Sequence, residues 1–104
     1  MSSLERRPVR LSRRARDDFT GILRFTAETW GLHQLKTYRD RLDEALLSIR
    51  DNPEIGHRRD DLPKTHRVLP VGAHVIVYRI EASGVGVVRI LHQRMTLSSA
   101  ISSR

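Results

Sequence analysis

The stretch that decides the fold is residues 68–95, VLPVGAHVIVYRIEASGVGVVRILHQRM. It contains two mostly apolar runs, 73–80 and 85–91, separated by a short turn that ends at Gly84. Two such runs, rich in valine and isoleucine and joined by a short turn, are typical of a β-hairpin. We therefore expect two paired strands here, and we expect a further strand at 66–70 to precede them.

Polar residues that are unusual in such strands lie within them or just after them. They are His74, Arg79, Arg89, His92 and Arg94. An arginine inside an apolar strand loses hydration and requires a partner in compensation. Two kinds of partner are open for these arginines: acidic residues of another protein, or acidic residues of this chain such as Glu81, Glu54 and Asp60.

Two helices are predicted before the hairpin. Residues 8–11 can form a short first strand, and Ser12 is a good N-cap because its hydroxyl can accept from a free backbone N–H of the first helical turn. Gly31 ends the first helix, since glycine adopts the backbone conformation of a C-terminal cap at low cost. The second helix spans about residues 32–50 and stops at Asn52-Pro53, because the residue before a proline is driven out of the helical region.

The link at Gly31 is so short that the two helices should pack as an antiparallel hairpin. Apolar residues recur in both helices at three- and four-residue intervals, which gives each helix one apolar face. We expect Trp30 to belong to the core of this hairpin. We expect the acidic residues Asp17 and Asp18 to lie mostly on another side of the first helix.

The element order is β-α-α-β-β-β, which indicates an α+β domain. We expect the helix hairpin to pack on one face of a small antiparallel β-sheet, within a single domain at 8–95. We also expect a flexible arm at 1–7 before this domain and, after it, a short, partly mobile tail at 96–104 with little to pack against. The two central strands are apolar on both faces, which is unusual for a sheet with one face in water. We therefore expect another chain to cover the free face.

Composition limits the kinds of partner. The 104 residues carry a formal net charge of +7, from 19 Lys and Arg against 12 Asp and Glu, which favours an acidic protein or a nucleic acid. Aromatic residues amount to only 5%, so few side chains are available to stack bases, and no direct specific nucleic-acid binding is expected. The sequence contains no cysteine and no run of about 20 apolar residues for a membrane span, and we expect no secretory signal. We expect a cytoplasmic protein with no cofactor.

Short motifs are spread in order along most of the chain. They are Leu11-Ser12 with Ala15 and Asp18, Trp30-Gly31, Tyr38 and Leu42, Asn52-Pro53 with Gly56 and Arg58, Arg67 with Val71-Gly72, Ile76-Val77-Tyr78-Arg79, Arg89-Ile90-Leu91-His92, and Arg94-Met95. In this order and spacing they resemble the ParE branch of the RelE/ParE toxin superfamily, over about residues 11–95. The chain departs from the pattern at Thr96, where ParE-like chains commonly have an acidic residue.

The resemblance implies a small toxin of a type II toxin–antitoxin system. Such toxins are encoded beside a labile antitoxin, usually of the ParD type, which wraps and blocks them. Free ParE toxins poison DNA gyrase without known catalysis of their own. A ParD-like antitoxin and DNA gyrase are therefore the expected partners, and no catalytic residue is expected.

The candidate contact residues are the basic side chains of the free sheet face and its rim, together with two arginines of the loop at 54–65. They are Arg58, Arg59, Arg67, His74, Arg79, Arg89, His92 and Arg94. His74 and His92 can face each other across neighbouring strands, where they could act in acid–base chemistry, hold a metal, or bond to a strand neighbour or the antitoxin. No acidic or cysteine ligand stands beside them at the spacing of a metal site, so no zinc is expected.

Two alternatives stay open. The related RelE branch cleaves mRNA in the ribosome, which requires an acid, a base and cations for the developing phosphate charge. Cations are plentiful here, but Val75 stands about where such nucleases often carry an arginine, and nothing that titrates near neutral pH follows His92. The other alternative is a decayed toxin that retains only antitoxin binding.

Overall fold

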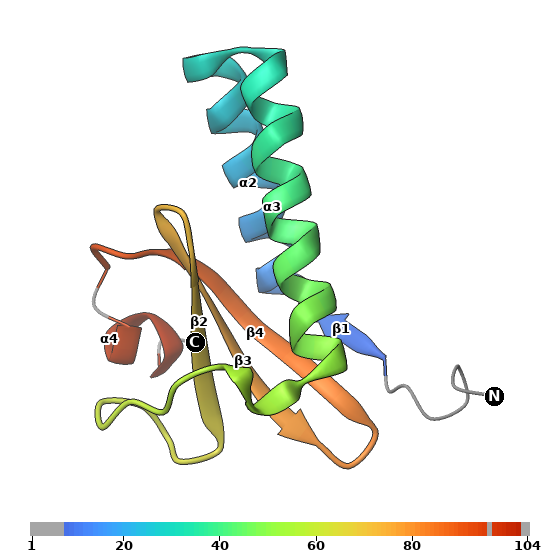
Figure 1. Ribbon diagram of the computed structural model, residues 1–104. Coiled ribbons are helices and arrows are strands. Elements are labelled where there is room, and N and C mark those ends of the chain that lie inside the picture. The colour runs from blue at the N-terminus through green and yellow to red at the C-terminus, as the bar shows by residue number, and fades with distance from the viewer. Residues whose placement is uncertain (1–7, 96, 103–104) are drawn as a thin grey trace, which may run out of the picture.

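The structure is a computed structural model that describes residues 8–95 and 97–102. Its elements are β1 (Val9–Leu11), α2 (Arg13–Trp30), α3 (Leu32–Asp51), η1 (Pro53–Ile55), β2 (His66–Val71), β3 (His74–Glu81), β4 (Gly84–His92) and α4 (Leu97–Ser102). The predicted β-α-α-β-β-β order is confirmed, with η1 and α4 as additions (Figure 1). The expected arm at 1–7 lies outside the described residues, as do positions 96, 103 and 104 of the expected tail.

The four strands form one sheet in the order β1-β4-β3-β2. The pairs β2/β3 and β3/β4 are antiparallel, whereas β1 pairs with β4 in parallel, with Val9 opposite Val85. The expectation of a purely antiparallel sheet is therefore wrong for this edge. The helix hairpin separates β1 from the other strands, and such a long connection allows β1 to lie parallel to its neighbour.

Both ends of the first helix are as expected. The Ser12 side chain caps α2 by accepting from the backbone N–H of Ala15 at 3.0 Å. Gly31 has φ +94°, which an L side chain rarely adopts, so glycine is the residue that permits this close link between the helices. The sharp turn fixes α2 and α3 side by side as a hairpin.

Apolar residues pack on both sides of the sheet. The larger core lies between the helices and the sheet and consists of Ala15, Tyr38, Leu42, Ile49, Val71, Ile76, Tyr78, Val85, Val87 and Ile90. The smaller core consists of Leu62, Val68, Val75, Val77, Leu91 and Leu97. Alternate residues of β3 serve the two cores, which explains why that strand is apolar on both faces.

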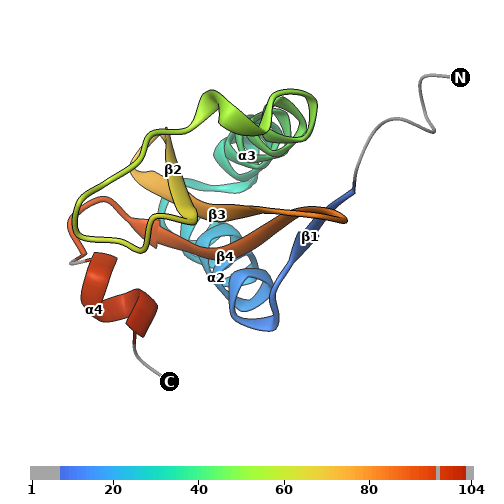
Figure 2. The same cartoon turned by 90° about the horizontal axis from the view of Figure 1, so that it is seen from below.

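The second face of the sheet is covered by this chain itself. Leu62, from the loop before β2, and Leu97, from α4, are 7% and 2% exposed. α3 and α4 lie on opposite sides of the sheet (Figure 2). The expectation that residues 97–102 have little to pack against is thus wrong, and no second chain is required over the part of the sheet that they cover.

The helix hairpin extends well beyond the sheet (Figure 1). Helices of 18 and 20 residues are about 27 to 30 Å long, longer than the part that the sheet can cover. At the far end Trp30 is 69% exposed and Leu32 is 77% exposed, so the expectation of a core role for Trp30 is wrong. No helix among the described residues is long and apolar enough to cross a membrane.

Candidate functional site

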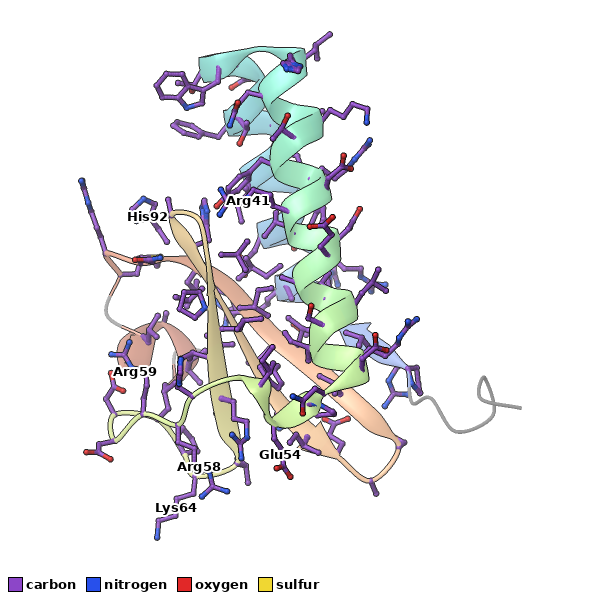
Figure 3. All side chains as sticks on the ribbon, in the orientation of Figure 1. Arg41, Glu54, Arg58, Arg59, Lys64 and His92 are labelled. Atoms are coloured by element: carbon purple, nitrogen blue, oxygen red, sulfur yellow. The ribbon has the colours of Figure 1, made fainter. Side chains whose placement is uncertain are left out.

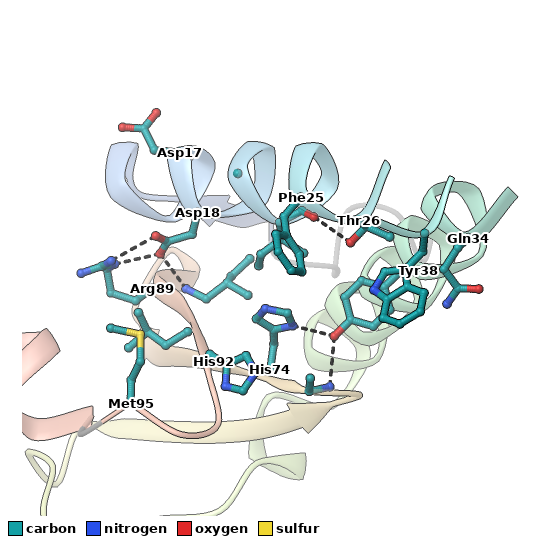
Figure 4. Close-up of a pocket in the computed structure, with 16 residues that line it drawn as sticks. Asp17, Asp18, Phe25, Thr26, Gln34, Tyr38, His74, Arg89, His92 and Met95 are labelled. Carbon is teal, nitrogen blue, oxygen red and sulfur yellow. Dashed lines mark hydrogen bonds and ion pairs between the residues drawn. The ribbon is translucent and has the colours of Figure 1, made fainter. Parts of the chain in front are cut away.

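An open groove of about 590 Å³ lies where the helix hairpin α2–α3 extends past the sheet. Its wall comes mainly from α2, and its floor comes from the turn end of β3, the end of β4 and the residues that follow (Figure 4). The side chains that give it its character are Asp18, Ile22, Phe25, Trp30, Tyr38, His74, Arg89, His92 and Met95. Of these, Phe25 is 62% exposed and Met95 is 46% exposed, so the apolar wall has no cover from the described residues.

A partly buried ion pair lies at one end of the groove. Arg89 donates from Nε to Asp18 Oδ2 at 2.8 Å and from Nη2 to Oδ1 at 3.0 Å, and the backbone N–H of Ile90 donates to Oδ2 at 2.9 Å. The two side chains are only 15% and 16% exposed, and the hydrogen bond to Asp18 raises the pKa of Arg89. This pair fixes α2 to β4, and Arg89 is already fully engaged within the chain.

The sequence pattern did not predict this role of Asp18. It indicated a position mostly off the apolar face, and the acidic residues considered as partners for the arginines were Glu81, Glu54 and Asp60. Asp18 nevertheless follows Ala15 by three positions and precedes Ile22 by four, which is the spacing of the inner face. An acidic residue on that face is the signal that could have found the pair.

A second polar cluster forms the floor of the groove. The Tyr38 hydroxyl lies 2.7 Å from His74 Nδ1 and 3.0 Å from the Val71 carbonyl oxygen, and it accepts from the backbone N–H of Ala73 at 3.2 Å. His74 and His92 are directly paired across β3 and β4, with ring centroids 5.4 Å apart. The prediction that these two histidines face each other is confirmed.

Burial shapes the protonation of this cluster. It raises the pKa of Tyr38, and it is the main cause that lowers the pKa of His74. The neighbouring His92 lowers the pKa of His74 further, while Asp18 acts in the opposite direction. His74 therefore favours the neutral form near pH 7 and can still respond to a new charge in the groove.

The other predicted contact residues lie apart from the groove or at its edge. Arg79 pairs with Glu81 at 2.8 Å, and Arg59 pairs with Asp61 at 2.8 Å, so both have partners within the chain. Arg67 donates to the carbonyl oxygen of Gly56 at 2.9 Å.

Arg58 and Arg94 are exposed. Arg58 and Lys64 lie at the opposite end of the molecule from the hairpin tip, whereas His92 lies beside the hairpin (Figure 3). The eight predicted residues therefore do not form one continuous basic rim. His74, Arg89 and His92 belong to the groove, and Arg94 directly precedes its Met95.

No group of three or more potential metal ligands occurs among residues 8–95 and 97–102. The site consists of an apolar wall beside a small polar floor, with an ion pair at one end. An exposed apolar surface with a few polar groups suits the binding of an amphipathic segment.

Comparison with known proteins agrees with this arrangement. The family model of the ParE toxin of the type II toxin–antitoxin system parDE matches residues 9–97. The chain is thus a toxin of the type II toxin–antitoxin class. More particularly, the chain belongs to the ParE toxin family, which confirms the resemblance seen in the sequence.

Relatives of known name support the assignment. Toxin ParE1 of Caulobacter vibrioides is 34% identical over 89 residues, which cover 86% of this chain and 92% of that protein. Toxin ParE1 of Mycobacterium tuberculosis is 38% identical over 71 residues, covering 67% of this chain and 72% of that protein. A solved chain from a chromosomal ParDE toxin–antitoxin system of P. aeruginosa superposes with a TM-score of 0.71 at 15% identity, over 83% of this chain and 95% of that chain, and confirms the α+β fold.

Proposed function

We propose that this chain is a cytoplasmic toxin that a ParD-like antitoxin holds inactive, and that the free toxin inhibits DNA gyrase by protein–protein contact. The family match supports the general role. The observation that carries the proposal is the uncovered apolar groove. An exposed apolar surface of this kind marks an interaction site on a soluble protein.

The antitoxin is the occupant that fits the groove. Phe25, Trp30 and Met95 offer apolar surface to a partner helix or strand, while the net charge of +7 favours an acidic one. These features favour a contact on the side of the molecule that carries the helix hairpin. The part of the opposite sheet face that Leu62 and Leu97 cover is already occupied by the chain itself.

The state of the basic side chains supports a non-catalytic mechanism. RNA cleavage requires cations free to stabilise a developing phosphate charge beside an acid and a base. Here Arg59, Arg79 and Arg89 are each paired with a carboxylate of the chain. These ion pairs argue against a phosphate-stabilising role for these three arginines.

The test compares two targets in parallel. Purified protein is added to DNA gyrase acting on relaxed plasmid, and separately to ribosomes translating a defined mRNA. We expect supercoiling to stop while the mRNA stays intact, and the antitoxin from the adjacent reading frame to restore supercoiling. Cleaved mRNA with unaffected gyrase would instead identify a ribonuclease. No effect in either assay, together with tight antitoxin binding, would identify a decayed toxin.

A further inference from the structure

We propose that the antitoxin places a carboxylate against His74 at the floor of the groove, and that this imidazole takes up a proton when the complex forms. The inference rests on the proposed function, because it names a contact of the same groove. It makes toxin neutralisation sensitive to pH.

The hydrogen bonds of His74 accommodate the added proton. The Tyr38 hydroxyl has one hydrogen and two acceptors within reach, the Val71 carbonyl oxygen at 3.0 Å and His74 Nδ1 at 2.7 Å. When the imidazole is protonated, Nδ1–H donates to the Tyr38 oxygen and the hydroxyl donates to Val71. Protonation therefore breaks no hydrogen bond of this cluster.

The second nitrogen of His74 is the one available to a partner. In an imidazole Nε2 and Nδ1 point in different directions, and Nδ1 is directed at Tyr38 (Figure 4). His74 itself is only partly buried and lines the groove. A partner carboxylate that approaches along the groove can accept from Nε2–H of the charged ring, which is a stronger bond than one from a neutral donor.

His92 differs from its neighbour in its hydrogen bond. Its Nδ1 lies 3.1 Å from the backbone N–H of Arg94, which donates to it. A neutral imidazole that accepts at Nδ1 carries its hydrogen on Nε2 and donates from there. His92 can thus donate to a carboxylate from Nε2 while its Nδ1 keeps the bond from Arg94.

The charged and titratable groups around His74 come from three elements. α3 contributes Tyr38, over whose ring Arg41 lies at 5.8 Å, and β4 contributes His92. α2 contributes Asp18, which is bound to Arg89 of β4.

None of these groups supplies a free carboxylate to His74. Burial and His92 lower its pKa and outweigh Asp18, so the ring is mostly neutral in the free chain near pH 7. A carboxylate from outside would raise this pKa and draw a proton into the complex.

The neighbours of the histidines favour an acidic protein over a nucleic acid. Asp17 stands on the α2 side of the groove and would repel a polyanion, whereas the charge of Asp18 is compensated by Arg89. A segment that is apolar except for one carboxylate avoids this repulsion, because its carboxylate contacts only His74 on the floor of the groove. The exposed Phe25 and Trp30 then contact the apolar part of the same segment.

Titration calorimetry tests the inference with the full-length antitoxin from the adjacent reading frame. Binding is measured at about pH 6 and pH 8, in buffers of different ionisation enthalpy, so that proton uptake is obtained directly. We expect net uptake of a fraction of one proton and roughly tenfold tighter binding at the lower pH, since each bound proton contributes at most about tenfold per pH unit.

A variant and a matched control determine whether His74 is the residue that takes up the proton. His74→Asn keeps an amide near the position of Nδ1 for the bond to Tyr38 and removes the ionisable ring, so we expect uptake to disappear. The control is His57→Asn, because His57 is exposed and lies outside the residues that line the groove. Should the His74 variant fold poorly, NMR titration of the intact chain replaces it, with the His74 pKa expected to be higher in the complex than in the free protein.

The outcomes separate this inference from the proposed function. Tight binding without proton uptake, or with the same uptake in His74→Asn, would overturn the inference and leave the proposed function standing. An antitoxin that does not bind at either pH would overturn both.

Discussion

The base and the tip of the helix hairpin share the same two helices and differ in what covers them. At the base, Leu42 and Ile49 are fully buried against the sheet. At the tip, Phe25, Trp30 and Leu32 are all more than 60% exposed. The apolar pattern of the sequence is the same in both places. An apolar helix face is therefore not enough to predict burial. The sheet buries this face only along its own length, and the apolar residues beyond it stay exposed.

The largest effect is expected at the base. Leu42→Ala should lower the free energy of unfolding by about 3 kcal/mol, because it removes a fully buried side chain and leaves a cavity. Urea denaturation followed by circular dichroism measures the change. The matched control is Leu32→Ala on the same helix, where 77% exposure predicts less than about 0.5 kcal/mol. Similar losses for both variants would mean that the tip is packed as tightly as the base.

The ion pair between α2 and β4 should have the next largest effect. Asp18→Ala leaves Arg89 mostly buried without its partner and is expected to lower the free energy of unfolding by about 2 kcal/mol. Asp17→Ala is the control, because that neighbouring carboxylate is exposed. Thermal or urea unfolding of the two variants gives the comparison. Equal stability of the two would show that the pair does not hold the hairpin to the sheet.

Local signals explain which parts of the fold were predictable. The cap at Ser12 and the turn at Gly31 each depend on neighbouring residues, so both helix ends followed from the sequence. The parallel pairing of β1 with β4 did not follow from the sequence. It depends on which strand of the assembled sheet has a free edge, and that sheet is built from segments far apart in the chain. The short helix α4 was not predicted for the same reason, since Leu97 is buried only by residues that the assembled sheet brings together.

The candidate site was predictable only in part. The prediction that His74 faces His92 came from two consecutive strands joined by a short turn. The turn alone does not fix this pair, because a β-bulge between Val77 and Tyr78 shifts the register of β3 and β4 by one residue before it reaches the two histidines. The groove itself did not follow, because it exists only where the hairpin extends past the sheet. Arg89 was correctly singled out as needing a partner, but the partner is Asp18, 71 positions away, and no local pattern connects the two.

A buried histidine at the start of β2 should make stability depend on pH, with a smaller effect than the substitutions above. His66 is 7% exposed, and burial followed by the nearby Arg79 lowers its pKa. The unfolded chain therefore binds a proton at higher pH than the folded chain does. Stability should be unaffected by this group well above pH 6.5 and should fall as the pH decreases below that value.

Urea denaturation at about pH 7.5 and pH 5.5 measures this dependence, and His66→Gln should reduce it. The exposed His57 provides the control variant, His57→Gln, which should keep the full dependence. A decrease in stability that is the same in all three proteins would assign it to other groups.

The smallest effect on folding is expected at the tip, where binding should change instead. Trp30→Ala removes a large side chain that is 69% exposed, so the free energy of unfolding should change by less than about 0.5 kcal/mol. If the tip is covered by the antitoxin, the same substitution should weaken that complex by at least about tenfold, as loss of an interface tryptophan commonly does. Calorimetry with the antitoxin and urea denaturation of the free chain give the two numbers.

Leu47→Ala provides the control for an exposed apolar residue outside the groove, since Leu47 is 49% exposed on α3 and does not line it. It should change neither antitoxin affinity nor stability. Equal affinity of all three proteins would mean that the exposed tip is not the antitoxin surface. A loss of affinity confined to Trp30→Ala would instead show that the antitoxin buries the part of the helix hairpin that the sheet leaves exposed. An exposed side chain contributes to binding but not to folding when it becomes buried only in the complex.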